Sequence, residues 1–160
     1  MGGYSKNLIF EKAQPEHRHL IDRLMVVAFT PYVQKLHHID AVGGPYPWLL
    51  SEINRGNVYI CSEGNDIKGV VMIQHQDTDL SIDYLAVDPN HQNEGIGSWL
   101  LDQVTYMARK MNIKTIRLNT AEMMGGLLRF YCRHGFEETH KALPAHKGDT
   151  HIRVYMTKIL

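Results

Sequence analysis

The sequence predicts a single domain of the α/β (α+β) class, with a mixed, mostly antiparallel central sheet of about seven strands flanked by about four helices. The chain has 160 residues, of which 44% are hydrophobic, and this is enough for one core without disulfides or a structural metal. Three strand-like segments precede a glycine-containing loop, and a helix and another strand follow it. We therefore expect residues 1–160 to form one domain.

The first third of the chain predicts one strand and two helices. The strand covers Leu8–Ala13, and Pro15 then marks a helix start, because proline fits the first helical position. This helix is expected to end near Pro31. From Thr30 to Pro47 the pattern is irregular and predicts a loop, followed by a short helix through Ile53. The apolar residues of the first helix recur at helical spacing: Leu20, Ile21, Leu24, Val27 and Ala28.

An antiparallel meander is expected next. Asn57–Cys61 and Lys68–Ile73 are apolar segments separated by turn residues, which predicts a hairpin. A third strand, Leu80–Val87, ends at Asp88-Pro89, because proline cannot donate a hydrogen bond to a sheet.

The second half of the chain predicts a strand–helix–strand unit and a terminal hairpin. Thr115–Asn119 is β-branched and alternating, so it could lie parallel to the strand that ends at Val87. A helix over Leu127–His134 is closed by Gly135, where a left-handed cap costs least. The helix that precedes Thr115–Asn119 has the clearest apolar stripe: Ile96, Trp99, Leu100, Val104, Met107 and Met111. Two segments form the terminal hairpin: Phe136–Leu143 and His151–Lys158.

Composition narrows the classes of partner and the compartment. Seventeen basic residues balance seventeen acidic ones, so nothing predicts a nucleic-acid or membrane partner. Cys61 and Cys132 lack metal-type spacing, and the first thirty residues show neither a signal peptide nor a spanning segment, which favours a cytoplasmic protein. The only tight histidine pair is His37-His38, and no histidines recur at the helical spacing of a zinc site. We expect no metal.

The loop Gln92–Gly97 has the features of a pyrophosphate site at the start of a helix. Backbone N–H groups at a helix start bind phosphate when the chain can approach closely, and Gly95 and Gly97 allow that approach. By themselves, two spaced glycines are equally compatible with a simple turn into a helix. A dinucleotide-binding loop would need three glycines after the first strand, and this loop comes later and has two.

The order of motifs resembles the GNAT superfamily of N-acetyltransferases. A strand ending in Leu85-Ala86-Val87-Asp88-Pro89 precedes the loop, and a later helix contains Tyr131 and closes in Gly135-Phe136. The resemblance implies that acetyl-coenzyme A is the acyl donor, with pantetheine along the strand and pyrophosphate on the loop. The cofactor residues it implies are Leu85, Ala86, Val87, Gln92, Asn93, Glu94, Gly95, Ile96, Gly97 and Ser98. Two features depart from the family: the negative charge of Glu94, and the absence of a pantetheine-binding asparagine in Thr120–Gly126.

The resemblance also implies a direct attack of an amine on the thioester, with Tyr131 as the acid that protonates the leaving thiolate. Its alternative role is packing. Asp83 could bind or deprotonate the amine, or be a solvated strand residue. Asn119 could position a water or the substrate, or simply hydrogen-bond at the strand end.

Acceptor specificity in this family comes from the segment between the first two helices and from the terminal hairpin loop. The candidate acceptor residues are Tyr32, His37, His38 and Trp48, with His146 and His151 in the hairpin. Trp48 could instead anchor the second helix, and loop histidines are often only solvated. A small-molecule amine is the favoured acceptor; a protein N-terminus or lysine, and a non-catalytic acyl-coenzyme A sensor, are the alternatives. The acyl length is left open, as is the oligomeric state, for which a homodimer is one option.

Overall fold

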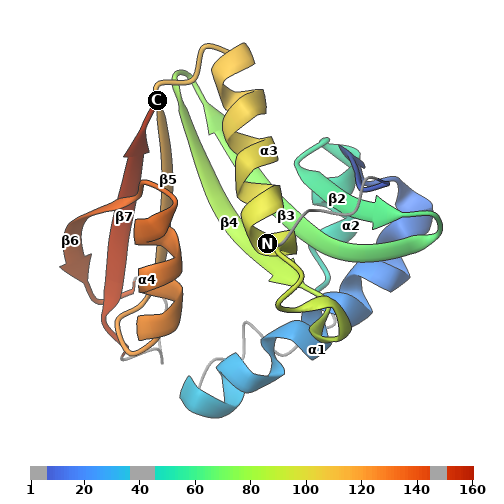
Figure 1. Ribbon diagram of the computed structural model, residues 1–160, viewed down its shortest axis with the longest axis horizontal. Coiled ribbons are helices and arrows are strands. Elements are labelled where there is room, and N and C mark those ends of the chain that lie inside the picture. Colours follow the sequence, from blue (N-terminus) through green and yellow to red (C-terminus); the bar gives the residue numbers. More distant parts are fainter. Residues whose placement is uncertain (1–6, 37–45, 145–150) are drawn as a thin grey trace. The chain divides into compact units, whose positions relative to one another are not determined.

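The computed structural model describes residues 7–36, 46–144 and 151–160 (Figure 1). In chain order the elements are β1 (Ile9–Lys12), η1 (Pro15–His17), α1 (Arg18–Leu36), α2 (Leu49–Asn54), β2 (Val58–Glu63), β3 (Asp66–Gln76), β4 (Asp79–Val87), η3 (Pro89–His91), α3 (Ile96–Lys110), β5 (Thr115–Ala121), α4 (Gly125–Arg133), β6 (Glu137–Ala142) and β7 (Arg153–Ile159).

The strands form a seven-stranded, mostly antiparallel sheet in the order β1-β2-β3-β4-β5-β7-β6. Strands β4 and β5 pair in parallel, and β5 pairs with β7 in the antiparallel sense. The predicted fold class is therefore confirmed, including the parallel pair. The segment between β4 and β5 contains α3, as a parallel connection requires.

Residue contacts divide the chain into two compact units. The N-terminal unit comprises Met1–Ile73 and Tyr84–Gln103, and the C-terminal unit comprises Gln74–Asp83 and Val104–Leu160. The boundaries fall within β3, β4 and α3, so each of these elements contributes to both units.

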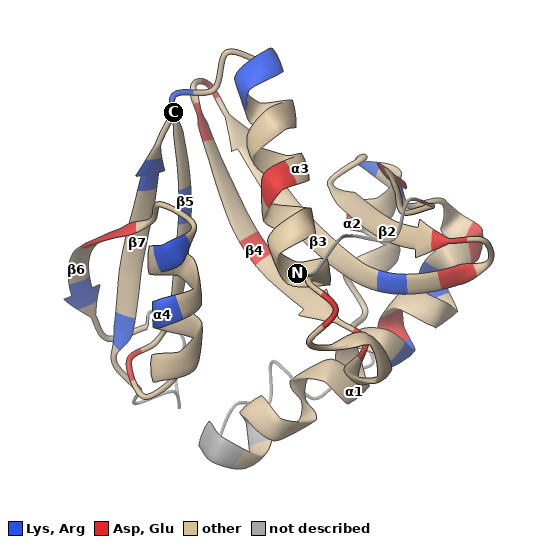
Figure 2. Ribbon diagram, viewed as in Figure 1, with Lys and Arg blue, Asp and Glu red and all other residues tan. Residues whose placement is uncertain are grey.

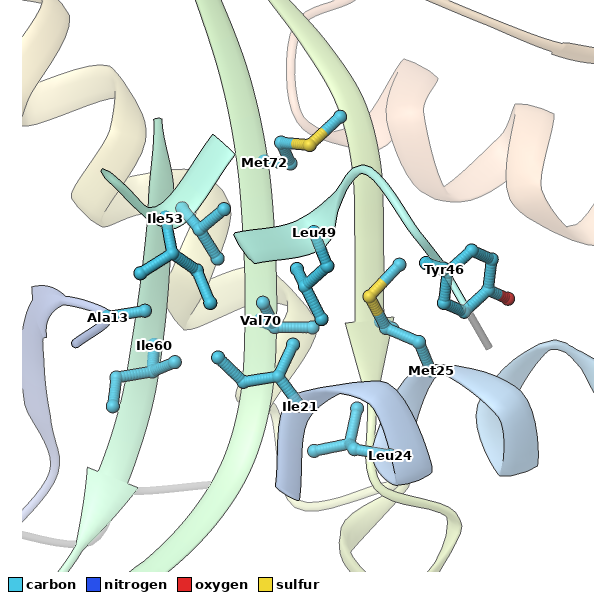
Figure 3. Close-up of a cluster of buried hydrophobic side chains, with 12 residues drawn as sticks. Ala13, Ile21, Leu24, Met25, Tyr46, Leu49, Ile53, Ile60, Val70 and Met72 are labelled. Atoms are coloured by element: carbon cyan, nitrogen blue, oxygen red, sulfur yellow. The ribbon is translucent and has the colours of Figure 1, made fainter. Parts of the chain in front are cut away.

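The core of the N-terminal unit joins α1 and α2 to one face of β2 and β3. Figure 3 shows Ile21 and Met25 of α1 and Leu49 of α2 directed toward the strand residues Ile60 and Val70. All five side chains are almost completely buried. Burying a side chain of this size contributes about 1.5–3 kcal/mol, so this cluster holds the two helices on the sheet. The cluster comprises Ala13, Ile21, Leu24, Met25, Tyr46, Leu49, Ile53, Val58, Ile60, Val70, Met72 and Ala86.

Helix α1 is longer than the sequence pattern predicts. It continues through Pro31 to Leu36, so the expectation of irregular chain from Thr30 is wrong over 30–36. Proline removes only one backbone donor, and residues 32–36 contain no glycine or further proline to stop the helix. The hydroxyl of Thr30 donates to the carbonyl of Val26 at 2.7 Å, inside the same helical turn.

In the C-terminal unit, the strand faces alternate between buried and exposed residues. Leu80, Ile116 and Met156 are buried, whereas Ser81, Arg117 and Asn119 are exposed or half-exposed. Leu80 lies opposite Ile116, and Ser81 lies opposite Arg117, so each face continues from β4 into β5. This two-residue period places one set of side chains in the core and the other in solvent.

Most predicted elements are confirmed with small boundary shifts. Strand β5 extends to Ala121, two residues beyond the prediction, and α4 begins at Gly125. Basic residues occupy the last turn of α3, as expected for the negative end of the helix dipole (Figure 2). Among the described helices, none combines the length and the apolar character needed to cross a membrane.

Candidate active site

The glycine loop, Gln92–Gly97, connects η3 to α3 through two left-handed residues. Asn93 has a φ of 67° and Gly95 a φ of 79°. Asparagine tolerates this region, and glycine adopts it without steric cost. The carbonyl of Gly95 accepts the first helical hydrogen bond of α3, from Trp99 N at 2.9 Å. Gly95 therefore turns the chain directly into the helix.

The first turn of α3 presents backbone donors where the loop ends. Backbone N–H groups in the first turn of a helix have no acceptor inside the helix, and the positive end of the helix dipole lies at this turn, which begins at Ile96. The Ile96 side chain is buried, which ties this turn to the core, while Gly97 and Ser98 are half-buried. Such an arrangement suits an anion such as pyrophosphate.

A close approach between β3 and α3 holds this turn against the sheet. A Cβ atom at Gly69 would lie 2.8 Å from Leu100 Cδ1, 3.1 Å from Ile96 Cγ2 and 3.3 Å from the carbonyl of Ala86. A larger residue would force the side chains of Leu100 and Ile96 to shift, so glycine keeps this approach close. The sequence pattern did not single out Gly69, although an isolated glycine inside a strand pattern signals a close backbone approach.

The carboxylate of Glu94 lies near two basic residues, His91 and Lys68. Its carboxylate is half-exposed and lies 2.8 Å from Nδ1 of His91. Lys68, nearly buried on β3, pairs with Glu63 at 3.1 Å. The hydrogen bond from Glu63 raises the pKa of Lys68 most, and the charge of Glu94 adds to this effect. Glu94 thus faces solvent and a histidine, the condition under which a carboxylate is tolerated beside a phosphate site.

The strand segment Leu85–Val87 lies beyond the part of β4 that pairs with β5. The ladder between β4 and β5 covers three residue pairs, from Asp79–Thr115 to Ser81–Arg117, and Leu85–Val87 lies beyond it. Ala86 is buried, while Leu85 and Val87 are half-buried. A ligand with amide groups can add to such a strand through main-chain hydrogen bonds.

Tyr131 lies in α4 and packs among aromatic rings of the C-terminal unit. Its ring makes edge contacts with Phe130 at 5.3 Å and with Phe136 at 5.7 Å between centroids, and it is 8% exposed. Gly135, with a φ of 87°, ends this helix as predicted. The ring therefore has a packing role, and this is compatible with a chemical role for its hydroxyl.

Asp83 and Asn119 lie on exposed parts of β4 and β5. The hydroxyl of Ser81 donates to Oδ1 of Asp83 at 3.1 Å. Because Asp83 is exposed, the burial that the base hypothesis requires is not found at this side chain. Asn119 is exposed and lies opposite Tyr155 of β7.

The acceptor candidates of the N-terminal unit fall into different environments. Tyr32 is half-buried within α1, and His37 and His38 lie outside the described residues, as does His146. The ring of Trp48 stacks on Tyr84, with 5.0 Å between ring centroids, and contacts Tyr46 at 5.3 Å. Trp48 therefore anchors α2, which is the structural role that the sequence left open for it. The sequence does not reveal this aromatic cluster, because its members come from segments that are far apart in the chain.

Tyr46 is the buried member of that cluster. Its backbone N–H donates to Oδ1 of Asp22 at 2.9 Å, which fixes the chain before α2 to α1. Burial raises the pKa of Tyr46 to about 12, with smaller contributions from Tyr84 and Asp22.

A cavity of about 420 Å³ lies in the N-terminal unit, next to the start of the glycine loop. Its lining reaches His91 but includes no residue of Gln92–Ser98, so it is distinct from the first turn of α3. Across the described parts of the chain, no three His, Cys, Asp or Glu side chains are grouped to hold a metal ion.

Comparisons with known proteins place this architecture in a family. The model of the acetyltransferase (GNAT) domain matches residues 54–138, slightly more than half of the chain. The PaiA N-acetyltransferase of Thermoplasma acidophilum, solved with coenzyme A, is 16% identical with a TM-score of 0.77, over 96% of this chain and 99% of that one. Naa50 of Arabidopsis thaliana, solved with a bisubstrate analogue, is 18% identical with a TM-score of 0.75, over 96% and 99%.

A third solved structure, a GNAT family acetyltransferase from Elizabethkingia anophelis with acetyl-coenzyme A bound, is 20% identical with a TM-score of 0.69, over 98% and 100%. These identities are low, so the solved structures establish similarity of fold. The family model covers β2 to the start of β6, which includes the glycine loop and Tyr131. The chain belongs to the GNAT acetyltransferase family and is an enzyme of the N-acetyltransferase class.

Proposed function

We propose that this enzyme transfers an acetyl group from acetyl-coenzyme A to the primary amine of a small molecule, by direct attack within a ternary complex. The observation that carries the proposal is the glycine loop. Its left-handed Gly95 turns the chain into α3, and the donors of the first helical turn follow immediately.

The loop and strand β4 divide the work of holding the cofactor. Main-chain N–H groups from Gly95 to Ser98, with the polar side chains of Gln92 and Asn93, bind the pyrophosphate. Leu85–Val87 lies past the last residue that β4 pairs with β5, so its main chain pairs with the pantetheine amides. A main-chain N–H of this segment donates to the acetyl oxygen as charge develops there. When bound, acetyl-coenzyme A supplies the activated acetyl group as a thioester.

Three side chains manage protons and water. The hydroxyl of Tyr131 protonates the departing sulfur; the reference pKa of a phenol, ~10, lies near that of a thiol, ~8.5, so the transfer needs no ionised tyrosine. Asn119 positions a water molecule or the amine on the exposed strand face. Asp83 attracts the ammonium form of the acceptor and accepts its proton through solvent.

Acceptor recognition involves Tyr32 and Trp48, together with the histidines 37 and 38 between their elements. The part of Trp48 that remains exposed beside Tyr84 contributes an apolar surface for the carbon skeleton of the amine. This favours a small organic amine over a peptide backbone, which would need a row of main-chain donors and acceptors.

Thiol release from acetyl-coenzyme A, measured over a panel of small amines and a panel of short peptides, tests the proposal. Turnover with small amines and little with peptides supports it. Preference for peptide N-termini or lysines would replace it with protein acetylation. Coenzyme A binding without thiol release on either panel would indicate a sensor of acyl-coenzyme A and overturn the enzymatic role of Tyr131.

A further inference from the structure

The exposed face of the C-terminal unit's sheet presents a row of three side chains from three adjacent strands. Asn119 of β5 lies opposite Tyr155 of β7, and Tyr155 lies opposite His140 of β6. The rings of His140 and Tyr155 stack with their centroids 4.5 Å apart and their planes 6° apart. We call these residues the Asn119–Tyr155–His140 row; it spans two strand spacings, or roughly 10 Å.

The opposite face of the same strands is covered. Lys158, on the buried side of β7, donates to the hydroxyl of Thr105 in α3 at 3.3 Å and lies over the ring of Phe136. Leu118 and Met156 are buried on that side. The row therefore stands on the solvent side, where a ligand can reach it.

A β-bulge places the hydroxyl of Thr139 beside His140. The register of β6 shifts between Glu138 and His140, which frees Thr139 from the regular pairing. The hydroxyl of Thr139 donates to the carbonyl of Tyr155 at 3.2 Å and lies 3.0 Å from Nδ1 of His140. A hydroxyl has one proton, so this pair of contacts is compatible with Nδ1 as the donor in the second one. In that tautomer the neutral imidazole has a lone pair on Nε2.

The row offers a ligand both hydrogen-bond acceptors and an aromatic face. Within residues 7–36, 46–144 and 151–160, Nε2 of His140 and the side-chain amide of Asn119 have no hydrogen-bond partner. One face of the Tyr155 ring is covered by His140, and Asn119 is the cross-strand neighbour of Tyr155 on β5. A cationic donor such as an ammonium group fits lone pairs and an aromatic face together.

The charges around the row are compatible with a cation. Arg117, on the same face, is in an ion pair with Asp79 at 3.2 Å. Arg153, two residues along β7, has an interaction of its own. Asp83 and Glu137 add carboxylates to this face, and residues of both signs lie on these strands in Figure 2.

We propose that the Asn119–Tyr155–His140 row binds a second ammonium group of the acceptor, with Nε2 of His140 accepting its hydrogen bond, so that the preferred substrates are long diamines. The inference rests on the proposed function, because it takes the reacting amine to lie at Asn119. The second nitrogen is then roughly two strand spacings away. His140 is a specificity residue that does not touch the reacting atoms.

The tautomer of His140 is measured directly by nitrogen-15 NMR of histidine-labelled protein at pH 8.5, above the reference pKa of imidazole, about 6.5. The expected spectrum shows a protonated Nδ1 and an unprotonated Nε2. Thr139→Val should shift the population toward the tautomer protonated on Nε2. A native spectrum dominated by protonated Nε2 would overturn the proposal, whatever the enzymatic activity.

Kinetics with octane-1,8-diamine and the matched monoamine octylamine test the subsite. A hydrogen bond to a charged group predicts a KM about 10-fold to 100-fold lower for the diamine. His140→Phe keeps a ring stacked on Tyr155 and should raise the KM for the diamine to the value for the monoamine, which abolishes that difference. His75→Phe, an exposed histidine near the end of β3, serves as the control and should retain it.

Equal KM values for the two amines in the native enzyme, or an undiminished difference in His140→Phe, would overturn the subsite while leaving amine acetylation intact. If no amine is turned over, the proposed function fails instead. In that case the Nε2 resonance of His140, followed while octane-1,8-diamine is added to the coenzyme A complex, decides whether the row binds the diamine. An unchanged resonance would reject it.

Discussion

The two units of this protein use different chemical groups for their proposed roles: one relies on main-chain groups and the other on side chains. In the N-terminal unit, the proposed cofactor site relies mainly on main-chain groups of the glycine loop, where Gly95 and Gly97 have no side chain, and Gly69 of β3 allows the close approach of α3. In the C-terminal unit, Tyr131 and the Asn119–Tyr155–His140 row act through side chains whose neighbours depend on strand register. Adding atoms should therefore damage the first region, and removing single polar atoms should damage the second.

The largest effect is expected from removing one oxygen atom in the C-terminal unit. Tyr131→Phe keeps the edge contacts with Phe130 and Phe136 but deletes the proton for the leaving sulfur. Because general acid catalysis contributes about 100-fold to 10,000-fold, kcat and kcat/KM should fall together by that order. Steady-state kinetics and calorimetry with coenzyme A check this. Full activity in a folded variant would leave Tyr131 as a packing residue.

The next effect comes from adding atoms to the glycine loop. Gly97→Val should prevent close approach of the pyrophosphate to the helix start, and losing hydrogen bonds to a charged group weakens coenzyme A binding by about 100-fold. Isothermal calorimetry measures the change. Gly64→Asn is the control: this turn residue has a φ of 61°, and an added Cβ would meet nothing within 4 Å. Unchanged affinity in folded Gly97→Val would reject the loop assignment.

A smaller effect concerns stability at high pH. The pKa of Tyr46 is raised to about 12, so the unfolded chain releases this proton near pH 10 while the folded protein retains it. Above pH 10 the unfolded state therefore binds fewer protons than the folded state. The free energy of unfolding then falls by about 1.4 kcal/mol for each pH unit above 10.

Urea unfolding at pH 9 and pH 11 measures this loss. Tyr46→Phe should lose less stability between these two values than the native protein does. An identical loss in both proteins would show that the buried phenol does not control the alkaline limit.

The smallest expected effect is at Glu94. Its carboxylate is paired with His91, so Glu94→Gln should leave coenzyme A affinity unchanged or raise it by about two-fold to five-fold, the scale of one charge at a helix start. Calorimetry at low salt detects the gain, and 0.5 M salt should remove it. A loss of affinity would mean that the carboxylate supports the loop.

Most elements, and the turn of the glycine loop into α3, could be predicted from sequence because their signals are local. Gly135 closes α4 as expected, since a left-handed cap depends on one residue's backbone. The extension of α1 beyond Pro31 was missed because one lost hydrogen bond resembles a helix end in sequence. Trp48 could be named as a candidate, but its stacking on Tyr84 joins residues far apart in the chain.

The sequence alone determined the family resemblance, the order of strands and helices, and the loop that precedes α3, because periodicity and glycine placement act over a few residues. The tertiary structure decided which side chains meet. The pairing of Lys68 with Glu63, the contact of Gly69 with Leu100 and the stacking of His140 on Tyr155 depend on strand register and on a bulge. A shift of one residue would turn each of these side chains to the other face of the sheet, and register follows from the packing of the whole core.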